Sequence, residues 1–147
     1  ETGQVCTSPK RFIVVDELYE DFVAKAQEAV EAIRVGAWDD PEADMGPLSS
    51  ESARDEVVQR IQDAAAHGAT LRTGGEKLDR PGWFMSPALL TDVDPDSDLG
   101  CNELFGPAVI VYRAQDEEDA LRLANHTDYG LQASVWTENL ERGERFH

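Results

Sequence analysis

The chain has 147 residues, of which 41% are hydrophobic, and this length and apolar content fit one domain with its own core. Its 13 lysines and arginines against 30 aspartates and glutamates give a formal net charge of −17. A surface this acidic repels phosphate backbones and anionic lipids, which argues against nucleic acids and acidic membranes as partners.

Neither a membrane segment nor a metal site is expected. Apolar runs stay well short of the roughly 18 residues that a spanning helix needs, so we expect no membrane insertion. The 2 cysteines form neither a disulfide framework nor a metal-ligand pattern, which fits a reducing, cytoplasmic location. The acidic cluster at residues 92–98 superficially resembles a calcium loop, but Pro95 interrupts it, so solvated loops and helix starts are the favoured interpretation.

The first half of the chain predicts one strand followed by two helices. Residues 12–15 form an apolar run, which predicts a short strand. The strand leads into a helix that Asp16 is expected to cap and that ends before Gly36. Ser49 or Ser50 opens a second helix, which ends at His67-Gly68. The inward positions of the first helix are expected at Leu18, Phe22, Ala26, Val30 and Ile33.

The second half alternates strands with helices. Short strands are predicted at 70–73 and 108–112, an extended stretch at 83–90, and a further strand at 131–136. A helix is predicted at 116–125, and another begins at Glu138. In the helix at 116–125 the inward residues are expected to be Ala120, Leu121, Leu123 and Ala124. Strands alternating with helices predict an α/β fold with a largely parallel sheet and flanking helices.

A cysteine lies almost at the amino terminus, where Cys6 sits in a turn or short helical segment that leads into the first strand. Backbone N–H groups and helix amino termini can raise the thiolate fraction of such a thiol and so produce a nucleophile. The alternative is an ordinary buried cysteine, because free cysteine is among the most buried residue types. Local spacing alone leaves both interpretations open.

Six blocks in order along the chain resemble the aldehyde dehydrogenase superfamily. The first is Gly3-Gln4-Val5-Cys6, similar to the segment that carries the catalytic cysteine of the family. A second, Glu103-Leu104-Phe105-Gly106-Pro107, resembles its E-[IL]-F-G-P motif. The others are Asp44-Met45-Gly46-Pro47-Leu48, Gly82-Trp83-Phe84-Met85-Ser86-Pro87, Asn125-His126-Thr127-Asp128-Tyr129-Gly130-Leu131 and Val135-Trp136-Thr137. The stretch after Cys6 is most similar to the succinate-semialdehyde branch.

The resemblance implies a role for three residues. Cys6 would be the nucleophile that attacks the aldehyde, passing through a thiohemiacetal and a thioester before water releases the carboxylic acid. Glu103 would accept hydrogen bonds from the ribose hydroxyls of the nicotinamide cofactor, and Phe105 would pack near the nicotinamide. Alternative roles are a solvated loop charge for Glu103 and core packing for Phe105. Cys101 is expected to be a bystander, the alternative being a disulfide with Cys6 that would silence the nucleophile.

The resemblance also implies a larger protein. Members of the family are much longer than 147 residues, so we expect residues 1–147 to be a partial catalytic domain that starts just before the nucleophilic cysteine. The nucleotide-binding domain and the C-terminal oligomerisation segment would then lie outside it. The implied parent is an oxidoreductase that uses NAD or NADP, acts on a small aldehyde and forms a homo-oligomer, either a dimer or a tetramer.

Two other functions remain open at this stage. The isolated chain is expected to be inactive as a dehydrogenase, because it has neither a G-x-G-x-x-G motif nor the general-base block of the family. It could instead show thiol-esterase-like reactivity at Cys6, or be a non-catalytic folded module that self-associates through unpaired sheet edges.

Overall fold

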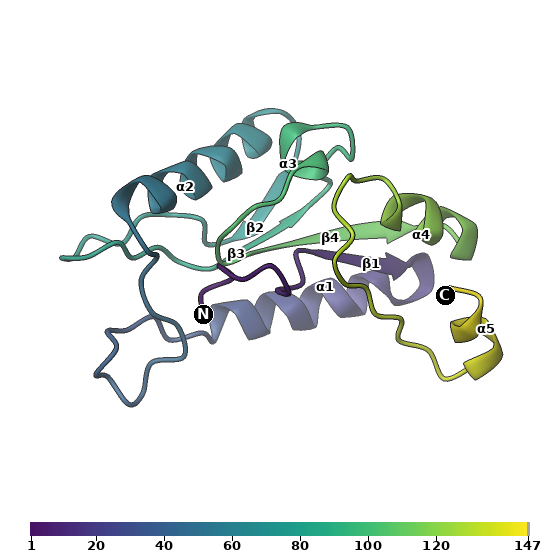
Figure 1. The fold of residues 1–147 in the computed structure, drawn as a ribbon, viewed down its shortest axis with the longest axis horizontal. Helices are drawn as coiled ribbons and strands as arrows, with labels where there is room; N and C mark the ends of the chain where they lie inside the picture. Colours follow the sequence, from purple (N-terminus) through teal and green to yellow (C-terminus); the bar gives the residue numbers. More distant parts are fainter. Residues whose placement is uncertain (147) are drawn as a thin grey trace.

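Four strands form one sheet with helices on both faces (Figure 1). The computed structural model describes residues 1–146. The sheet order is β1-β4-β3-β2, in which β1 and β3 each pair with β4 in parallel and β2 joins β3 antiparallel. The elements are β1 (Arg11–Val15), α1 (Asp16–Glu31), α2 (Glu51–Ala66), β2 (Thr70–Thr73), β3 (Ala88–Thr91), α3 (Asp98–Cys101), β4 (Ala108–Ala114), α4 (Glu117–Ala124) and α5 (Leu140–Glu144). The predicted α/β fold with a largely parallel sheet is confirmed.

The period of two along each strand divides the core into two layers. Val14, Leu89 and Val111 point to one face, where they pack with Tyr19 and Val23 of α1. The alternate strand residues point to the other face and pack with α2 and α4, which lie on the opposite side of the sheet from α1 (Figure 1). This second layer contains Leu90, Ile110, Tyr112, Val57, Ile61 and Leu123. The central strands are therefore covered on both faces, as a parallel sheet requires.

The ends of the long helices follow the predicted signals only in part. Ser50 caps α2, since its hydroxyl accepts a hydrogen bond from the Ala53 N–H at 3.1 Å, and His67 ends the helix. The prediction that Asp16 caps the first helix is wrong, because Val15 is the N-cap and Asp16 is the first helical residue. The Asp16 carboxylate instead accepts a hydrogen bond from Arg113 of β4 at 2.6 Å.

Three predicted inward residues are exposed: Leu18, Leu121 and Ala124. Leu18 is 60% exposed and Leu121 is 43% exposed, whereas Tyr19 and Val23 of α1 are buried. Phe22, Ala26 and Val30 of the predicted stripe do pack against the core, in part buried, beside the fully buried Tyr19 and Val23. The Arg113 guanidinium carbon lies over the Tyr19 ring, 4.1 Å from the ring centre. Ala124 is also exposed, which leaves Leu123 as the buried anchor of α4.

The strand predicted at 131–136 is absent, since these residues adopt no regular secondary structure. Within residues 1–146, β1 and β2 are the two outer strands of the sheet, and neither pairs with this segment. Without a neighbouring strand the apolar side chains remain in solvent, and Leu131 is 68% and Trp136 is 93% exposed. The short helix α3 was not anticipated, and α5 begins at Leu140 after the N-cap Asn139 instead of at Glu138.

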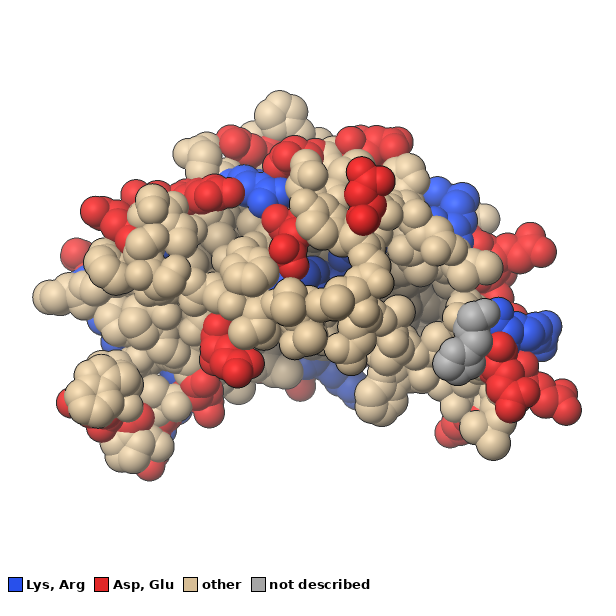
Figure 2. Space-filling model, in the orientation of Figure 1, with Lys and Arg blue, Asp and Glu red and all other residues tan. Residues whose placement is uncertain are grey.

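The charge of the surface is spread out. Carboxylates are distributed across the face shown in Figure 2, with few lysines and arginines between them. Side-chain oxygens in the acidic segment at 92–98 accept hydrogen bonds from nearby backbone N–H groups. Asp94 accepts from the Asp96 N–H at 3.0 Å, and Ser97 caps α3. Among residues 1–146, no helix has the length and apolar character that a membrane crossing requires.

Two matched substitutions test this assignment of core and surface. Ile61 is fully buried, so we expect Ile61→Ala to lower the free energy of unfolding by about 2 to 5 kcal/mol. Leu18→Ala removes an exposed side chain and should cost about 0.5 kcal/mol or less. Urea unfolding followed by circular dichroism measures both, and equal losses in the two variants would contradict the assignment of Ile61 of α2 to the core and Leu18 of α1 to the surface.

Candidate active site

Parallel pairing of β1 with β4 brings together two segments that are far apart in the sequence. The turn that contains Cys6 leads directly into β1, and residues 103–107 lead directly into β4. Arg11 is in register with Ile110, and the Ile110 N–H donates to the carbonyl of Lys10 at 3.0 Å. Because the two strands are parallel, the segments that precede them lie at the same edge of the sheet.

The Cys6 turn is a compact structure with its thiol exposed to solvent. The Ser8 N–H donates to the Val5 carbonyl at 3.1 Å, which closes the turn around the cysteine. The side-chain oxygen of Gln4 accepts a hydrogen bond from the Ser49 N–H at 2.9 Å, which ties the turn to the start of α2. Cys6 is thus an accessible thiol in an anchored turn, and the interpretation as an ordinary buried cysteine is wrong.

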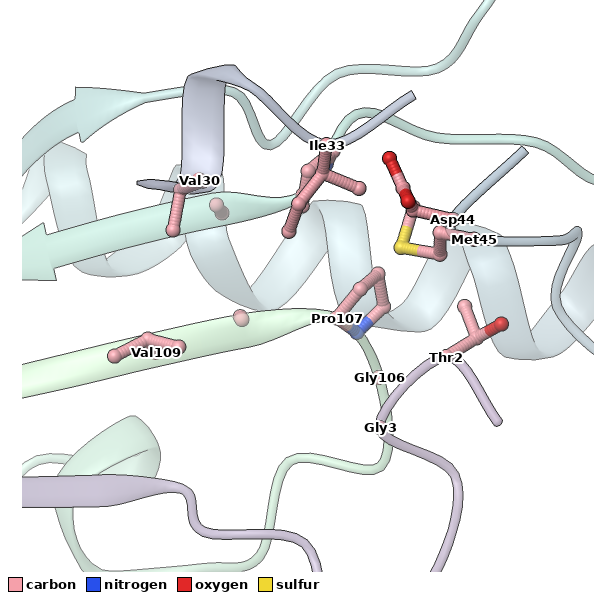
Figure 3. A pocket seen from close by; sticks show the side chains of 12 residues that line it. Thr2, Gly3, Val30, Ile33, Asp44, Met45, Gly106, Pro107 and Val109 are labelled. Atoms are coloured by element: carbon pink, nitrogen blue, oxygen red, sulfur yellow. The ribbon is translucent and has the colours of Figure 1, made fainter. Parts of the chain in front are cut away.

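A contact between two glycines brings the turn against residues 103–107. Gly3 has φ +67°, and a Cβ placed on it would lie 2.2 Å from the carbonyl oxygen of Gly106. Gly106 in turn lies against Val57 of α2, whose nearest methyl would be 2.7 Å from an added Cβ. Only glycine fits at both positions, and Figure 3 shows the two backbones side by side.

Contacts with α2 hold residues 103–107 in place. Leu104 is buried in the main core, and the Arg60 guanidinium donates to the Glu103 carbonyl at 2.8 Å. The same guanidinium binds the Asp98 carboxylate at 2.9 Å. A hydrogen bond from the Asn102 amide and the charge of Arg60 hold the pKa of Asp98 below its ordinary value. With Leu104 pointing inward, its neighbours Glu103 and Phe105 reach the surface, Glu103 in part and Phe105 with 43% of its area exposed.

Lys10 connects the two segments. Its ammonium group donates a hydrogen bond to the Gly3 carbonyl and lies over the Phe105 ring, 5.4 Å from the ring centre. Burial of the ammonium lowers the pKa of Lys10 below its ordinary value, and the nearby negative charge of Glu103 opposes that shift. Sequence reasoning did not identify Lys10 or Arg60 as site residues. The one available signal was the position of Lys10 immediately before a strand.

A hollow of about 260 Å³ lies next to the glycine contact, on the side of the sheet that faces α1 (Figure 3). Its apolar walls come from the end of α1, the loop that follows α1 and the beginnings of β3 and β4, with Val30, Ile33, Met45, Pro107 and Val109 among them. Gly3 and Gly106 also line it, whereas Cys6, Glu103 and Phe105 do not. The hollow therefore borders the backbone of the site and not its reactive side chains.

The second cysteine takes no part in this arrangement. Both cysteines are free, and the Cys101 thiol donates to the Pro95 carbonyl at 3.1 Å. Cys101 thus closes the loop around α3, and the alternative of a disulfide with Cys6 is wrong for this structure. Among residues 1–146, no group of three or more His, Cys, Asp or Glu side chains is arranged to hold a metal ion.

The arrangement has the parts that covalent chemistry on a carbonyl needs. An exposed thiol is the most nucleophilic side chain available near neutral pH. The Glu103 carboxylate and the Phe105 ring come from a segment at the same edge of the sheet, and both reach the surface, where a second molecule can contact them.

Comparisons with known proteins agree with this picture. Residues 1–147 match the aldehyde dehydrogenase family. A succinate-semialdehyde dehydrogenase [NADP(+)] of Mycobacterium avium (strain 104) is 46% identical over 144 residues, which are 98% of this chain and 30% of that protein. The crystal structure of succinic semialdehyde dehydrogenase from Streptococcus pyogenes, in complex with NADP+, superposes with a TM-score of 0.93 at 37% identity, covering 99% of this chain and 32% of that one.

A third relative is more distant in sequence but similar in fold. The structure of an aldehyde dehydrogenase from Bacillus cereus (E194S mutant) has a TM-score of 0.95 at 34% identity, covering 99% of this chain and 30% of that one. The chain thus spans about a third of the length of the relatives it matches. With its whole length matched and its fold shared, the chain belongs to the aldehyde dehydrogenase family.

Proposed function

We propose that this chain is the part of an NAD(P)-dependent aldehyde dehydrogenase that carries the nucleophile, Cys6. One observation supports this most directly: the exposed Cys6 turn and residues 103–107 share one edge of the sheet, in a chain that matches the family from end to end. Because the chain spans about a third of its relatives, we propose that it forms part of the catalytic domain. The rest of the protein then supplies the nucleotide-binding domain and the general base.

Cys6 acts through its sulfur. The thiolate attacks the aldehyde carbon and forms a thiohemiacetal, whose negative oxygen is stabilised by the backbone N–H of Cys6; such a donor is worth about 3 to 4 kcal/mol. Loss of hydride from the same carbon leaves a thioester on Cys6. Water then attacks the thioester, which releases the carboxylic acid and returns the thiol. The anchored turn around Cys6 holds the sulfur in place through these steps.

The exposed side chains at this edge fit the nicotinamide end of a dinucleotide. The Glu103 carboxylate can accept hydrogen bonds from two neighbouring ribose hydroxyls, and the Phe105 ring offers an apolar surface to a flat heterocycle. The bound cofactor would accept the hydride that leaves the carbon on Cys6. With a formal net charge of −17, this chain is a poor host for the phosphates, which we assign to the rest of the protein.

The substrate we propose is a small aldehyde of the succinate-semialdehyde type, and the cofactor NADP or NAD. Support comes from relatives named succinate-semialdehyde dehydrogenase [NADP(+)] at 45–46% identity. We also propose that the intact enzyme is a homo-oligomer and that the 147-residue chain alone does not oxidise aldehydes.

Cys6→Ser tests the nucleophile in the full-length protein. A hydroxyl is a far weaker nucleophile than a thiolate, so we expect kcat for aldehyde oxidation to fall by about 10³-fold or more. Cys101→Ser is the matched control, because a serine hydroxyl can replace the thiol as donor to Pro95, and kcat should stay within about twofold. Turnover that survives Cys6→Ser would refute the proposal.

Glu103→Gln tests the ribose contact. The substitution removes the negative charge but keeps the size, so we expect the KM for the cofactor to rise about tenfold, or about 1.4 kcal/mol, with a smaller change in the KM for the aldehyde. Glu28→Gln, at an exposed position of α1, is the matched control and should change neither KM. An unchanged cofactor KM in the Glu103 variant would contradict the assigned role.

Gly3→Ala tests the glycine contact that seats the Cys6 turn. The added Cβ would overlap the Gly106 carbonyl, so the turn must move away from residues 103–107, and we expect kcat to fall about 100-fold. Gly46→Ala is the control, since an added Cβ there meets no atom within 4 Å. Similar kcat values for the two variants would show that seating of the turn does not matter to the reaction.

A further inference from the structure

We propose that Lys10 is a positioning residue, whose ammonium group fixes the Cys6 turn against the Phe105 ring and beside Glu103. The inference rests on the proposed function, which gives Cys6, Glu103 and Phe105 their chemistry. Lys10 contacts none of the reacting atoms in this arrangement, and its effect is to set the distance between the nucleophile turn and the segment that meets the cofactor.

The first support is the closure of the turn. The Lys10 ammonium donates to the Gly3 carbonyl, so the chain from 3 to 10 forms a loop with Cys6 near its middle. The same glycine is pressed against Gly106 and has a positive φ, so its carbonyl has little freedom to turn away from Lys10. A single ammonium group thereby holds one end of the turn to the other.

The second support is the position of the charge. The ammonium lies over the face of Phe105, 5.4 Å from the ring centre, within the range of a cation–π contact. It is close enough to Glu103 for the two charges to attract each other. Burial lowers the pKa of Lys10 and would lower it further without that carboxylate, so the charged lysine and Glu103 depend on each other.

The third support is the backbone on either side of Lys10. Its carbonyl accepts the hydrogen bond from the Ile110 N–H that begins the pairing of β1 with β4. The backbone of Lys10 is therefore attached to the sheet, and its side chain reaches back to Gly3 at the start of the Cys6 turn. A residue one position earlier or later would point to the opposite face of the strand.

Hydrogen exchange in the full-length, cofactor-free protein tests the positioning directly. Lys10→Met keeps the aliphatic stem but removes every polar contact, so we expect amide exchange in residues 3–9 to become about tenfold faster, while exchange in α2 is unchanged. Lys10→Arg keeps the charge over the ring and should stay within about threefold of the parent. Lys25→Met, at an exposed site of α1, removes the same charge elsewhere and should leave the turn unchanged.

A second variant reports the coupling to Phe105. Phe105→Leu removes the ring and should also speed exchange in residues 3–9, and the double variant with Lys10→Met should be little faster than Lys10→Met alone, because the two act on one contact. Full additivity of the two effects, or unchanged exchange in Lys10→Met, would overturn the proposal.

Steady-state kinetics completes the test. Misplacement of the turn should lower kcat of Lys10→Met about tenfold or more, with a smaller change in the KM for aldehyde and substantial recovery in Lys10→Arg. Faster exchange with an unchanged kcat would show that Lys10 holds the turn but does not serve the reaction, and the proposal would be wrong. The Cys6→Ser result reports separately on the proposed function, so the two failures can be told apart.

Discussion

The parallel pairing of β1 with β4 is the constraint on which the candidate site depends. The register of the two strands pairs Arg11 with Ile110, and it thereby brings the segments that precede the strands to one place. A slip of one residue would turn the apolar side chains of β1 to the opposite face and would separate Lys10 from Phe105. The sheet thus determines both the two-layer core and the contacts of Gly3 and Lys10 with residues 103–107.

This pairing places the candidate site at the amino-terminal ends of the strands, which is not the usual place for a ligand site in an open α/β sheet. In open α/β sheets, ligands commonly bind outside the carboxyl ends of the strands. Here Cys6 precedes β1, and Glu103 and Phe105 precede β4, so all three lie at the amino ends. Order at this edge comes from hydrogen bonds between the two segments and the region of α2. Arg60 of α2 donates to the Glu103 carbonyl, and the Gln4 side chain accepts from the Ser49 N–H just before α2.

Much of the fold was predictable from the sequence, because strand and helix periods depend on local patterns of apolar residues. The strand at β4 and the capped start of α2 are examples, with Ser50 placed as expected. The segment 131–136 has a strand pattern but no partner within residues 1–146, and a strand exists only when another strand pairs with it. Leu18 shows a similar limit, since helical spacing does not reveal that Tyr19 and Val23 fill the layer under the sheet while Leu18 stays in solvent.

Only those residues of the candidate site that belong to a recognisable sequence motif could be predicted. Cys6, Glu103 and Phe105 were identified through motif resemblance, and the structure places their segments together. Lys10 contacts Phe105 and Arg60 contacts the Glu103 carbonyl, and both contacts join segments distant in the sequence. The position of Lys10 immediately before a strand is a local signal, but it does not reveal such a contact.

Backbone contacts hold the Cys6 turn in place, and they limit which positions of the candidate site can be substituted. The contacts at Gly3 and Gly106 involve backbone, and neither glycine tolerates a side chain. Thr7 and Val5, on either side of the cysteine, are exposed or half-buried and carry none of these contacts through their side chains. A library of variants at the candidate site can therefore change positions 5 and 7 without touching the backbone contacts, while positions 3 and 106 stay fixed.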